Sequence, residues 1–303
     1  MAHPHKKSTV HGWLVLDKTF GLTSTQALGK ARRLLGGRKA GHGGTLDPLA
    51  TGILPIAFGE ATKLIPYVVD GDKEYEFTVR WGEARTTDDS EGTVTATSAV
   101  RPTQDQIRAI LPRFIGLILQ KPPAFSALKI QGERAYDLAR AGAVVDLPPR
   151  EVTIFSLDFL DAPDALHARF RVACGKGMYV RSLARNMAEA LGTRGHVCAL
   201  RRTKVGPFTL NDSVTLKKLE AMNVAGEVGA ALLPLKAALG DTPSLAVTPQ
   251  ESCLLRAGQP ILIRPPHEAL LTAPLIFAEE SSAPVALIEP HAGTFRVLRG
   301  FSF

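Results

Sequence analysis

Lys39-Ala40-Gly41-His42-Gly43-Gly44-Thr45-Leu46-Asp47-Pro48-Leu49-Ala50-Thr51-Gly52 is the most distinctive stretch of this sequence, with four glycines around a single carboxylate. Glycine has no Cβ, so a backbone of this kind can approach a ligand closely. Asp followed by Pro is also a common start of a helix, with Asp as the N-cap and Pro in the first turn. Neither interpretation of Asp47 excludes the other.

Hydrophobic periodicity outside this stretch predicts both strands and helices. Residues 13–16 predict a short strand, and residues 73–79 alternate apolar and polar side chains as a half-buried strand does. Ser24 is expected to cap a helix that runs to about Leu35, with Gly36 as its C-terminal stop.

The same signals continue later in the chain. Thr103 opens a helix with a capping box to Gln106, and Pro112 should kink or shorten it. Residues 167–174 alternate as another strand and lead into a helix that contains Val180. Because strands and helices are interspersed without strict β-α-β alternation, the predicted class is α+β.

The domain organisation follows from shifts in composition. We predict a disordered tail over residues 1–10, a main domain over residues 11–240 and a small β-rich domain over residues 245–303. Residues 238–248 suit a linker. Within the main domain, residues 121–150 form a Pro-bounded segment that mixes basic and aromatic side chains.

The chain is basic, with a formal net charge of +7 and a pI of about 9.4. Such an excess suits a polyanionic partner, although it also occurs in proteins that never bind nucleic acid. On the helix before the glycine-rich stretch, Lys30, Arg32 and Arg33 share one face. They are either a solvated surface or contacts to phosphate groups.

The cysteines and the chain start predict the compartment. Cys174, Cys198 and Cys253 lie far apart without metal-binding spacing, which favours free thiols in a reducing environment. The start is polar and basic without an apolar core, and no apolar run approaches about 18 residues. We therefore expect a cytoplasmic protein without a membrane partner.

Several common catalytic motifs are missing from the sequence. Residues 36–44 lack the Gly-Lys-Ser/Thr ending of a P-loop, and Leu46 stands where a dinucleotide fingerprint needs its third glycine. Neither a His-Glu-x-x-His nor a Gly-x-Ser-x-Gly motif occurs. What remains for chemistry is a carboxylate, a few aromatic side chains and many cations.

Together with three further blocks in the same order, the glycine-rich stretch resembles the signature of the bacterial tRNA pseudouridine-55 synthase family, TruB. Trp13-Leu14-Val15-Leu16-Asp17-Lys18 is similar to its N-terminal motif, and Asp72-Lys73-Glu74-Tyr75 to the motif whose aromatic packs on the target base. Lys176-Gly177-Met178-Tyr179-Val180-Arg181-Ser182-Leu183 and Leu200-Arg201-Arg202 are similar to the last block. The resemblance implies a pseudouridine synthase fold, with a central mixed, mostly antiparallel sheet flanked by helices.

The implied reaction isomerises uridine at position 55 in the T-loop of tRNA. It moves the glycosidic bond from N1 to C5, exchanges no electrons, and therefore implies neither a cofactor nor a metal. Asp47 would be the catalytic group, as a covalent nucleophile or as the base that removes a sugar proton. A glycosidase would require two carboxylates, whereas the family pattern offers one.

The resemblance also implies a role for Arg181 and for Tyr75. Arg181 matches the arginine that pairs with the catalytic carboxylate and keeps it ionised. The alternative for Arg181 is a contact to a phosphate from the start of its helix. Tyr75 would stack on the uracil or take part in proton abstraction, whereas its place on the apolar side of a strand also suits an ordinary core tyrosine.

Three further residues are implied in binding the flipped base. His42 matches the residue that fills the space left when the base leaves its stack, although a histidine in a glycine-rich loop is more often only a loop residue. Tyr179 and Leu200 match positions that line the pocket, which is compatible with their being core residues.

The outer segments are implied in holding the RNA. Residues 121–150, which include Lys129, resemble the family's insertion that grips the T-arm of tRNA. The domain at 245–303 resembles the small PUA-like RNA-binding domain of these enzymes. No obligate protein partner is implied, so we expect a monomer.

The chain departs from the family pattern at two places. Thr19-Phe20 stands where Pro often follows Asp-Lys, which concerns only turn geometry. Thr86 stands where an Asp is common, whereas Asp89 keeps the second acidic position. Any role of the first acid is therefore in doubt here.

Two other functions remain as alternatives. A non-catalytic protein that binds or folds tRNA would need the cations and aromatics but not Asp47 opposite Arg181. A carboxylate-dependent glycosylase or hydrolase is disfavoured by the single obvious acid.

Overall fold

The computed structural model describes residues 10–303, apart from residues 38, 127, 131, 144 and 266. The predicted tail therefore lies almost entirely outside the described residues. So does the side chain of Lys129, whose backbone alone is described.

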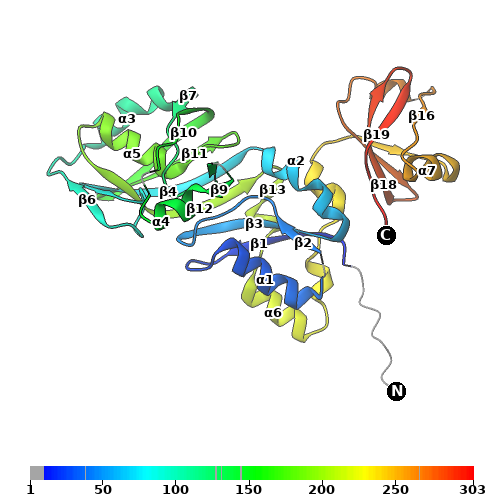
Figure 1. Ribbon diagram of the computed structural model, residues 1–303, viewed down its shortest axis with the longest axis horizontal. Helices are drawn as coiled ribbons and strands as arrows, with labels where there is room; N and C mark the ends of the chain where they lie inside the picture. Colours follow the sequence, from blue (N-terminus) through cyan, green and yellow to red (C-terminus); the bar gives the residue numbers. More distant parts are fainter. Residues whose placement is uncertain (1–9, 38, 127, 131, 144, 266) are drawn as a thin grey trace.

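A large mixed sheet forms the centre of the main domain (Figure 1). Its strands are β1 (Gly12–Lys18), β2 (Ala40–His42), β3 (Ala50–Phe58), β4 (Lys73–Trp81), β7 (Gly116–Gln120), β10 (Arg150–Asp164), β11 (His167–Cys174), β12 (Gly195–Val205), β13 (Phe208–Thr209) and β14 (Val214–Thr215). Their order is β14-β1-β3-β12-β4-β11-β10-β7, with β2 beside β3 and β13 beside β12. The pairs β1–β14 and β3–β12 are parallel and the rest antiparallel, so the predicted α+β class with a mixed, mostly antiparallel sheet is confirmed.

Helices cover one face of this sheet. They are α1 (Ser24–Leu35), α3 (Gln104–Ile110), α5 (Val180–Ala190) and α6 (Leu216–Val224), and all four contribute to one hydrophobic core. Residues that lie opposite each other on paired strands share a face. Leu200 lies opposite both Ala50 and Phe77, so core residues of β3, β12 and β4 point to the same side as these helices.

The helix ends follow local rules, with one correction. Thr23, not Ser24, is the N-cap of α1, because its side chain accepts a hydrogen bond from the Gln26 backbone in a capping box. Gly36 ends α1 in the left-handed conformation, as predicted. Thr103 caps α3 as predicted, and the segment that contains Pro112 continues as a short 3₁₀ turn.

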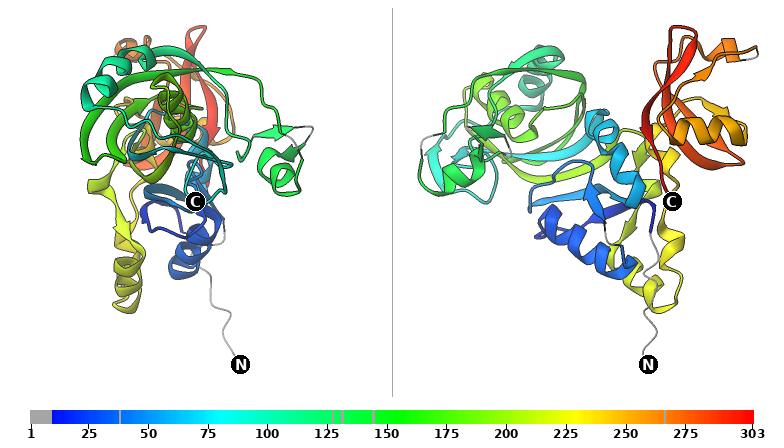
Figure 2. Two further views of the ribbon diagram at one scale, coloured as in Figure 1. Left: turned by 90° about the vertical axis from the view of Figure 1, so that its left-hand side faces the viewer. Right: turned by 45° about the vertical axis from the view of Figure 1, so that its right-hand side comes forward.

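Shorter elements connect the strands of the main domain. They are α2 (Ile65–Asp70), the hairpin of β5 (Glu83–Arg85) and β6 (Val94–Thr97), and the insertion with β8 (Lys129–Ile130), β9 (Glu133–Arg134) and α4 (Ala135–Arg140). The insertion joins β7 to β10 and projects away from the main sheet (Figure 2).

The C-terminal part forms its own sheet, in the order β15-β17-β18-β19-β16. Its elements are β15 (Ser244–Ala246), α7 (Pro249–Arg256), β16 (Ile261–Leu262), β17 (Ile276–Glu280), β18 (Ala283–His291) and β19 (Thr294–Gly300). Phe277, Leu287 and Phe301 share a second hydrophobic core with the main domain. This core lies on the face of β3 that carries Ile53 and Ala57.

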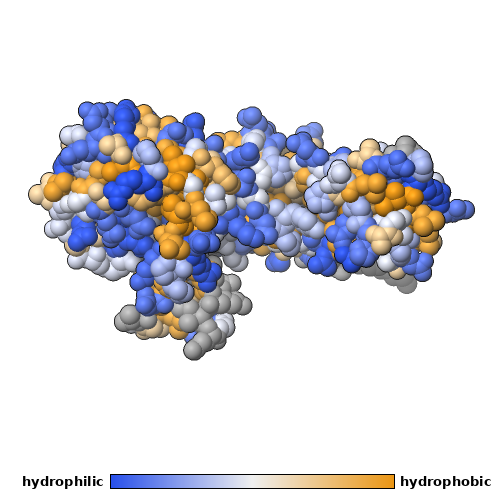
Figure 3. Space-filling view, turned by 90° about the horizontal axis from the view of Figure 1, so that it is seen from above, coloured by the Kyte–Doolittle hydropathy of each residue, from blue (hydrophilic) through white to orange (hydrophobic). Residues whose placement is uncertain are grey.

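Some apolar side chains remain on the surface. Leu117 and Leu119 of β7 and Phe155 of β10 are exposed. Viewed from above, hydrophobic residues form a band across the main domain (Figure 3). Within the described ranges, the helices lack the length and apolar character needed to cross a membrane.

Candidate active site

Asp47 lies in a turn that leads into a strand. The Ala50 amide donates to the Asp47 carbonyl at 3.0 Å, and β3 begins at Ala50. The interpretation of Asp47-Pro48 as a helix start is therefore wrong. The residues after Pro48 pair with β1 and β12, and these strand contacts outweigh the local preference for a helix.

Two buried side chains anchor the loop around Asp47. The Ser24 hydroxyl accepts from the Leu46 amide at 2.8 Å and donates to the Leu46 carbonyl at 3.0 Å. The Lys18 ammonium donates to the carbonyls of Leu22 at 2.7 Å and Pro48 at 3.3 Å. Burial lowers the pKa of Lys18 to about 8, although the nearby Asp47 charge acts in the opposite direction.

Asp47 is in contact with Arg181. Arg181 Nη2 lies 3.0 Å from Asp47 Oδ2, and the Asp47 side chain is 34% exposed, whereas that of Arg181 is only 6% exposed. Arg181 Nη1 lies 3.6 Å from Oδ2 of the buried Asp89. Arg181 therefore contacts two carboxylates. That of Asp47 is partly exposed and accessible to a ligand, whereas that of Asp89 is buried and inaccessible.

Two backbone carbonyls complete the surroundings of Arg181. Its Nη1 donates to Thr87 O at 3.0 Å and its Nη2 to Phe125 O at 2.9 Å. Arg181 therefore connects the Asp47 loop with the β5–β6 turn and with the start of the insertion. Because every contact is made by a planar guanidinium, its orientation is well defined.

Sequence reasoning missed the contribution of Asp89. Residues 83–97 are polar and rich in turn residues, a composition typical of an exposed loop or hairpin tip, and β5 and β6 do form a hairpin there. Asp89 nevertheless turns inward, where it accepts hydrogen bonds from the Thr87 hydroxyl and, at 3.0 Å, from the Glu91 amide. A neighbouring pair of Arg185 and Asp88 holds the same turn against α5. The only signal in the sequence was the match of Asp89 to the family's second acidic position.

Tyr75 and Leu200 lie on the helix-covered face of the sheet. Tyr75 of β4 is opposite Arg202 of β12, and Phe77 is opposite Leu200. Burial raises the pKa of Tyr75, so its phenol is protonated at neutral pH. Leu200 is buried and offers an apolar surface on the same face.

His42 and Tyr179 lie close in sequence to the two members of the ion pair. His42 precedes Asp47 in the glycine-rich loop, and Tyr179 precedes Arg181 at the start of α5. Burial lowers the pKa of His42, and its Nδ1 is buried without a hydrogen-bond partner among the described residues. Tyr179 occupies the N-cap position of α5, and its backbone exchanges two hydrogen bonds with the side-chain amide of Gln120, at 2.8 and 3.1 Å. Burial raises the pKa of the Tyr179 phenol, and the Asp47 charge acts in the same direction. Tyr179 thus lies within electrostatic reach of Asp47.

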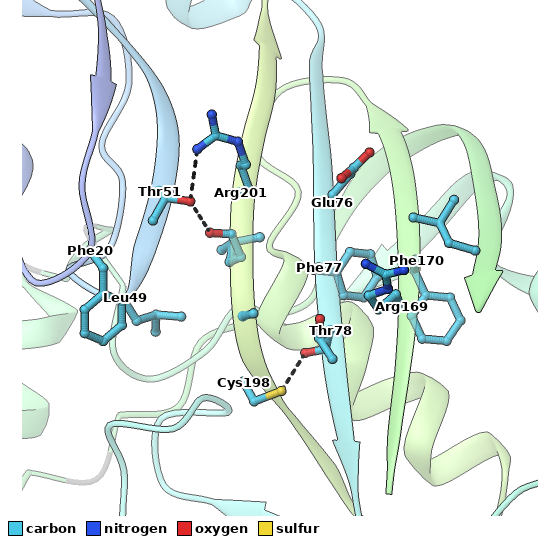
Figure 4. Close-up of a pocket in the computed structure, with 13 residues that line it drawn as sticks. Phe20, Leu49, Thr51, Glu76, Phe77, Thr78, Arg169, Phe170, Cys198 and Arg201 are labelled. Atoms are coloured by element: carbon cyan, nitrogen blue, oxygen red, sulfur yellow. Dashed lines mark hydrogen bonds between the residues drawn. The ribbon is translucent and has the colours of Figure 1, made fainter. Parts of the chain in front are cut away.

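A groove of about 270 Å³ lies on the other face of the sheet (Figure 4). Thr51, Glu76 and Arg201 line it, and these residues alternate with those that face the helices. It includes Leu200 but not Asp47, Tyr75 or Arg181. Among the described residues, no group of three or more His, Cys, Asp or Glu side chains is placed to hold a metal ion.

Two family models match consecutive parts of the chain. Residues 32–180 match the TruB family pseudouridylate synthase (N terminal domain), and residues 181–240 match the tRNA pseudouridylate synthase B C-terminal domain. A protein of Caulobacter vibrioides named tRNA pseudouridine synthase B is 49% identical over 307 residues, which cover 99% of both chains. The chain belongs to the TruB family of pseudouridylate synthases.

Other comparisons agree with membership of the TruB family. A protein of the same name from Bradyrhizobium diazoefficiens is 58% identical over 260 residues, covering 84% of this chain and 75% of that one. The crystal structure of a Cbf5-Nop10-Gar1 complex contains a chain with a TM-score of 0.74 at 23% identity, covering 99% of this chain and 88% of that one. At this identity the likeness concerns the fold, and the predicted pseudouridine synthase fold is confirmed. As a TruB-family pseudouridine synthase, the chain is an isomerase.

One departure from the TruB pattern has a structural explanation. Thr86, at the position where an acid is common, is exposed, and its hydroxyl accepts from the Thr93 amide at 3.1 Å within the hairpin. Arg181 is approached instead by Asp89, the acid at the second position. The hairpin therefore places Asp89 next to Arg181 without an acidic residue at position 86.

Proposed function

We propose that this TruB-family chain isomerises uridine to pseudouridine at position 55 in the T-loop of tRNA, with Asp47 as the reacting carboxylate. The observation that carries the proposal is the contact of the partly exposed Asp47 with the buried Arg181. Relatives of 49% and 58% identity bear the name tRNA pseudouridine synthase B, which supports tRNA as the substrate.

The chemistry requires one carboxylate and a shaped pocket. The C1′–N1 bond breaks, the uracil rotates, and C1′ joins C5, while N1 gains a proton and C5 loses one. Asp47 either attacks the sugar or base or removes a sugar proton, and both routes return it unchanged. Arg181 stabilises the ionised form of Asp47 in either route.

The aromatic residues fit the handling of a flipped base. A base inside an RNA loop must leave its stack before Asp47 can reach it, and this step costs free energy. In the proposal, Tyr75 stacks on the uracil, a contact worth roughly 1–3 kcal/mol. The uncharged His42 fills the vacated space, and Tyr179 and Leu200 line the pocket.

The surface of the chain suits a folded RNA. Lys30, Arg32 and Arg33 are exposed on α1, which precedes the glycine-rich loop. In this proposal the insertion, which includes Lys129, binds the T-arm. The C-terminal domain binds a further part of the tRNA. We also propose that the chain acts as a monomer in the cytoplasm, where tRNA is modified.

The direct test is to incubate unmodified tRNA with the wild type and with Asp47→Asn, and to map pseudouridine in the T-loop. The wild type should modify position 55, whereas Asp47→Asn should bind tRNA but yield no product, because an amide is neither a nucleophile nor a base.

Each other result has a defined meaning. An unmodified T-loop after incubation with the wild type would refute the proposed reaction, and binding without turnover would favour the tRNA-folding alternative. Turnover by Asp47→Asn would refute only the role of Asp47.

A further inference from the structure

Arg202 of β12 is a buried cation with an unusual set of partners. Its side chain is 2% exposed, and no described carboxylate forms a direct ion pair with it. Instead, Nε donates to Ile53 O at 2.8 Å, Nη2 to Gly44 O at 3.0 Å and Nη1 to Thr45 O at 3.4 Å. Burial lowers the pKa of Arg202, which reflects the cost of keeping a cation in this place. A role in stability alone accounts poorly for such a residue.

The partners of Arg202 belong to the parts that carry the proposed chemistry. Gly44 and Thr45 precede Asp47 by three and two residues in the same loop. Tyr75 lies opposite Arg202 on the neighbouring strand, on the same face of the sheet, and the nearby positive charge of Arg202 opposes the effect of burial on the pKa of the phenol. One guanidinium therefore binds the loop of Asp47 and lies on the strand next to Tyr75, on the same face of the sheet.

The backbone around Arg202 is built for this close approach. Gly52 of β3 lies opposite Arg202 with a φ of +95°, which favours glycine. A Cβ at this position would lie 2.2 Å from the Arg202 carbonyl oxygen and 2.9 Å from its nitrogen. The parallel pairing of β3 and β12 thus depends on glycine at the point where Arg202 reaches the loop.

We propose that Arg202 is a positioning residue that sets the Asp47 loop relative to the Tyr75 phenol. It is too deeply buried to bind RNA, so it acts through these two groups. A lysine cannot replace it, because its one nitrogen cannot occupy the separate positions of Nε, Nη1 and Nη2, each of which meets a different carbonyl in the plane of the guanidinium. The inference rests on the proposed roles of Asp47 and Tyr75.

The test compares Arg202→Lys with the wild type in three measurements. The single-turnover rate of pseudouridine formation should fall about 100-fold, the loss expected when a reacting group is displaced by about 1 Å. The Kd for tRNA, measured in the Asp47→Asn background, should not change. Hydrogen exchange should become faster at the loop amides of Gly43 and Leu46, which donate to Pro55 O of β3 and to the Ser24 hydroxyl of α1, and not throughout the protein.

Arg201→Lys is the matched control. Arg201 is the next residue of the same strand but faces the other side of the sheet, where it pairs with Asp17 at 2.8 Å. This control should match the wild type in all three measurements. Arg202→Gln, which removes the charge but keeps an amide donor, provides a second variant and should show the same signature as Arg202→Lys.

Several outcomes would overturn the assignment. They are wild-type turnover by Arg202→Lys, a parallel loss of tRNA binding, faster exchange throughout the chain, or failure of both Arg202 variants to fold. The exchange measurement needs no substrate. It therefore tests the positioning of the loop even if the wild type leaves the T-loop unmodified, a result that would refute the proposed function instead.

Discussion

At Arg181, one side chain meets acceptors from three separate segments: the Asp47 loop, the β5–β6 turn and the insertion. A guanidinium presents five N–H donors in a fixed plane, whereas a lysine ammonium is a single point of charge. The orientation of Asp47 therefore depends on the shape of its partner as well as on its charge.

Arg181→Lys should keep the positive charge and lose most of the turnover. We expect the single-turnover rate to fall about 100-fold, since a small displacement of a reacting group has an effect of that size. Rapid-quench measurement of pseudouridine formation checks this. Arg171→Lys, which alters an exposed pair with Glu76, is the control and should leave the rate unchanged. An Arg181→Lys enzyme as fast as the wild type would contradict the geometric account.

Lys18 makes the stability depend on pH. Its pKa is about 8 in the folded chain and returns to about 10.5 on unfolding, so between these values the unfolded state binds more protons. The stability of the wild type relative to Lys18→Met should therefore rise with pH, by about 2 kcal/mol between pH 7 and pH 10. Urea unfolding of both proteins across this range measures the difference. If the stability difference between the two proteins stayed constant or fell as the pH rises, the pKa of Lys18 would not be lowered by burial.

At the scale of elements, two neighbouring hydroxyls at the N-terminus of α1 have different roles. Thr23 caps the helix itself, whereas Ser24 holds Leu46, the residue before Asp47. The first contact is local to the helix, and the second connects the helix to the loop that carries Asp47.

The two hydroxyls should consequently behave differently when removed. Thr23→Ala should cost about 1 kcal/mol of unfolding free energy, the usual value for an N-cap, without slowing turnover. Ser24→Ala should cost about 1–3 kcal/mol, because it leaves buried backbone groups of Leu46 unpaired, and it should also slow turnover. Chemical unfolding and single-turnover assays of both variants test this. Equal turnover in the two variants would remove Ser24 from the support of the loop.

At the scale of the whole molecule, the C-terminal sheet is attached to the main domain through shared apolar residues and hydrogen bonds. Phe301 is buried against Phe277, and the Lys63 ammonium of the main domain donates to Gly300 O at 2.7 Å. Phe303, two residues further on, is mostly exposed and contacts the His11 ring at a tilt of 59°, with ring centroids 4.9 Å apart.

Phe301→Ala should therefore weaken the attachment of the C-terminal sheet much more than Phe303→Ala. Loss of a buried phenylalanine typically costs about 3–5 kcal/mol, whereas an exposed aromatic pair contributes about 0.5–1.5 kcal/mol. Calorimetry, together with protease cleavage between the two sheets, distinguishes the variants. Equal melting of Phe301→Ala and the wild type would contradict the assigned packing.

The sequence by itself determined the features that depend on near neighbours. The alternation over residues 73–79 placed Tyr75 and Phe77 on one side, because successive side chains of a strand point to opposite faces. Gly36 ended its helix because only glycine enters the left-handed conformation easily. The ordered motifs identified the family, and through it they indicated Arg181 as the partner of Asp47.

Only the tertiary structure decided the features that depend on distant partners. Asp47-Pro48 leads through a turn into β3, which pairs with β1 and β12, and the Ser24 side chain binds Leu46 in place of capping the helix. Asp89 is buried, although its hairpin looked exposed in the sequence. Arg202 reaches carbonyls 149 to 158 residues away along the chain. Such contacts leave no periodic signal in the sequence, because the partners meet only when the complete sheet has formed.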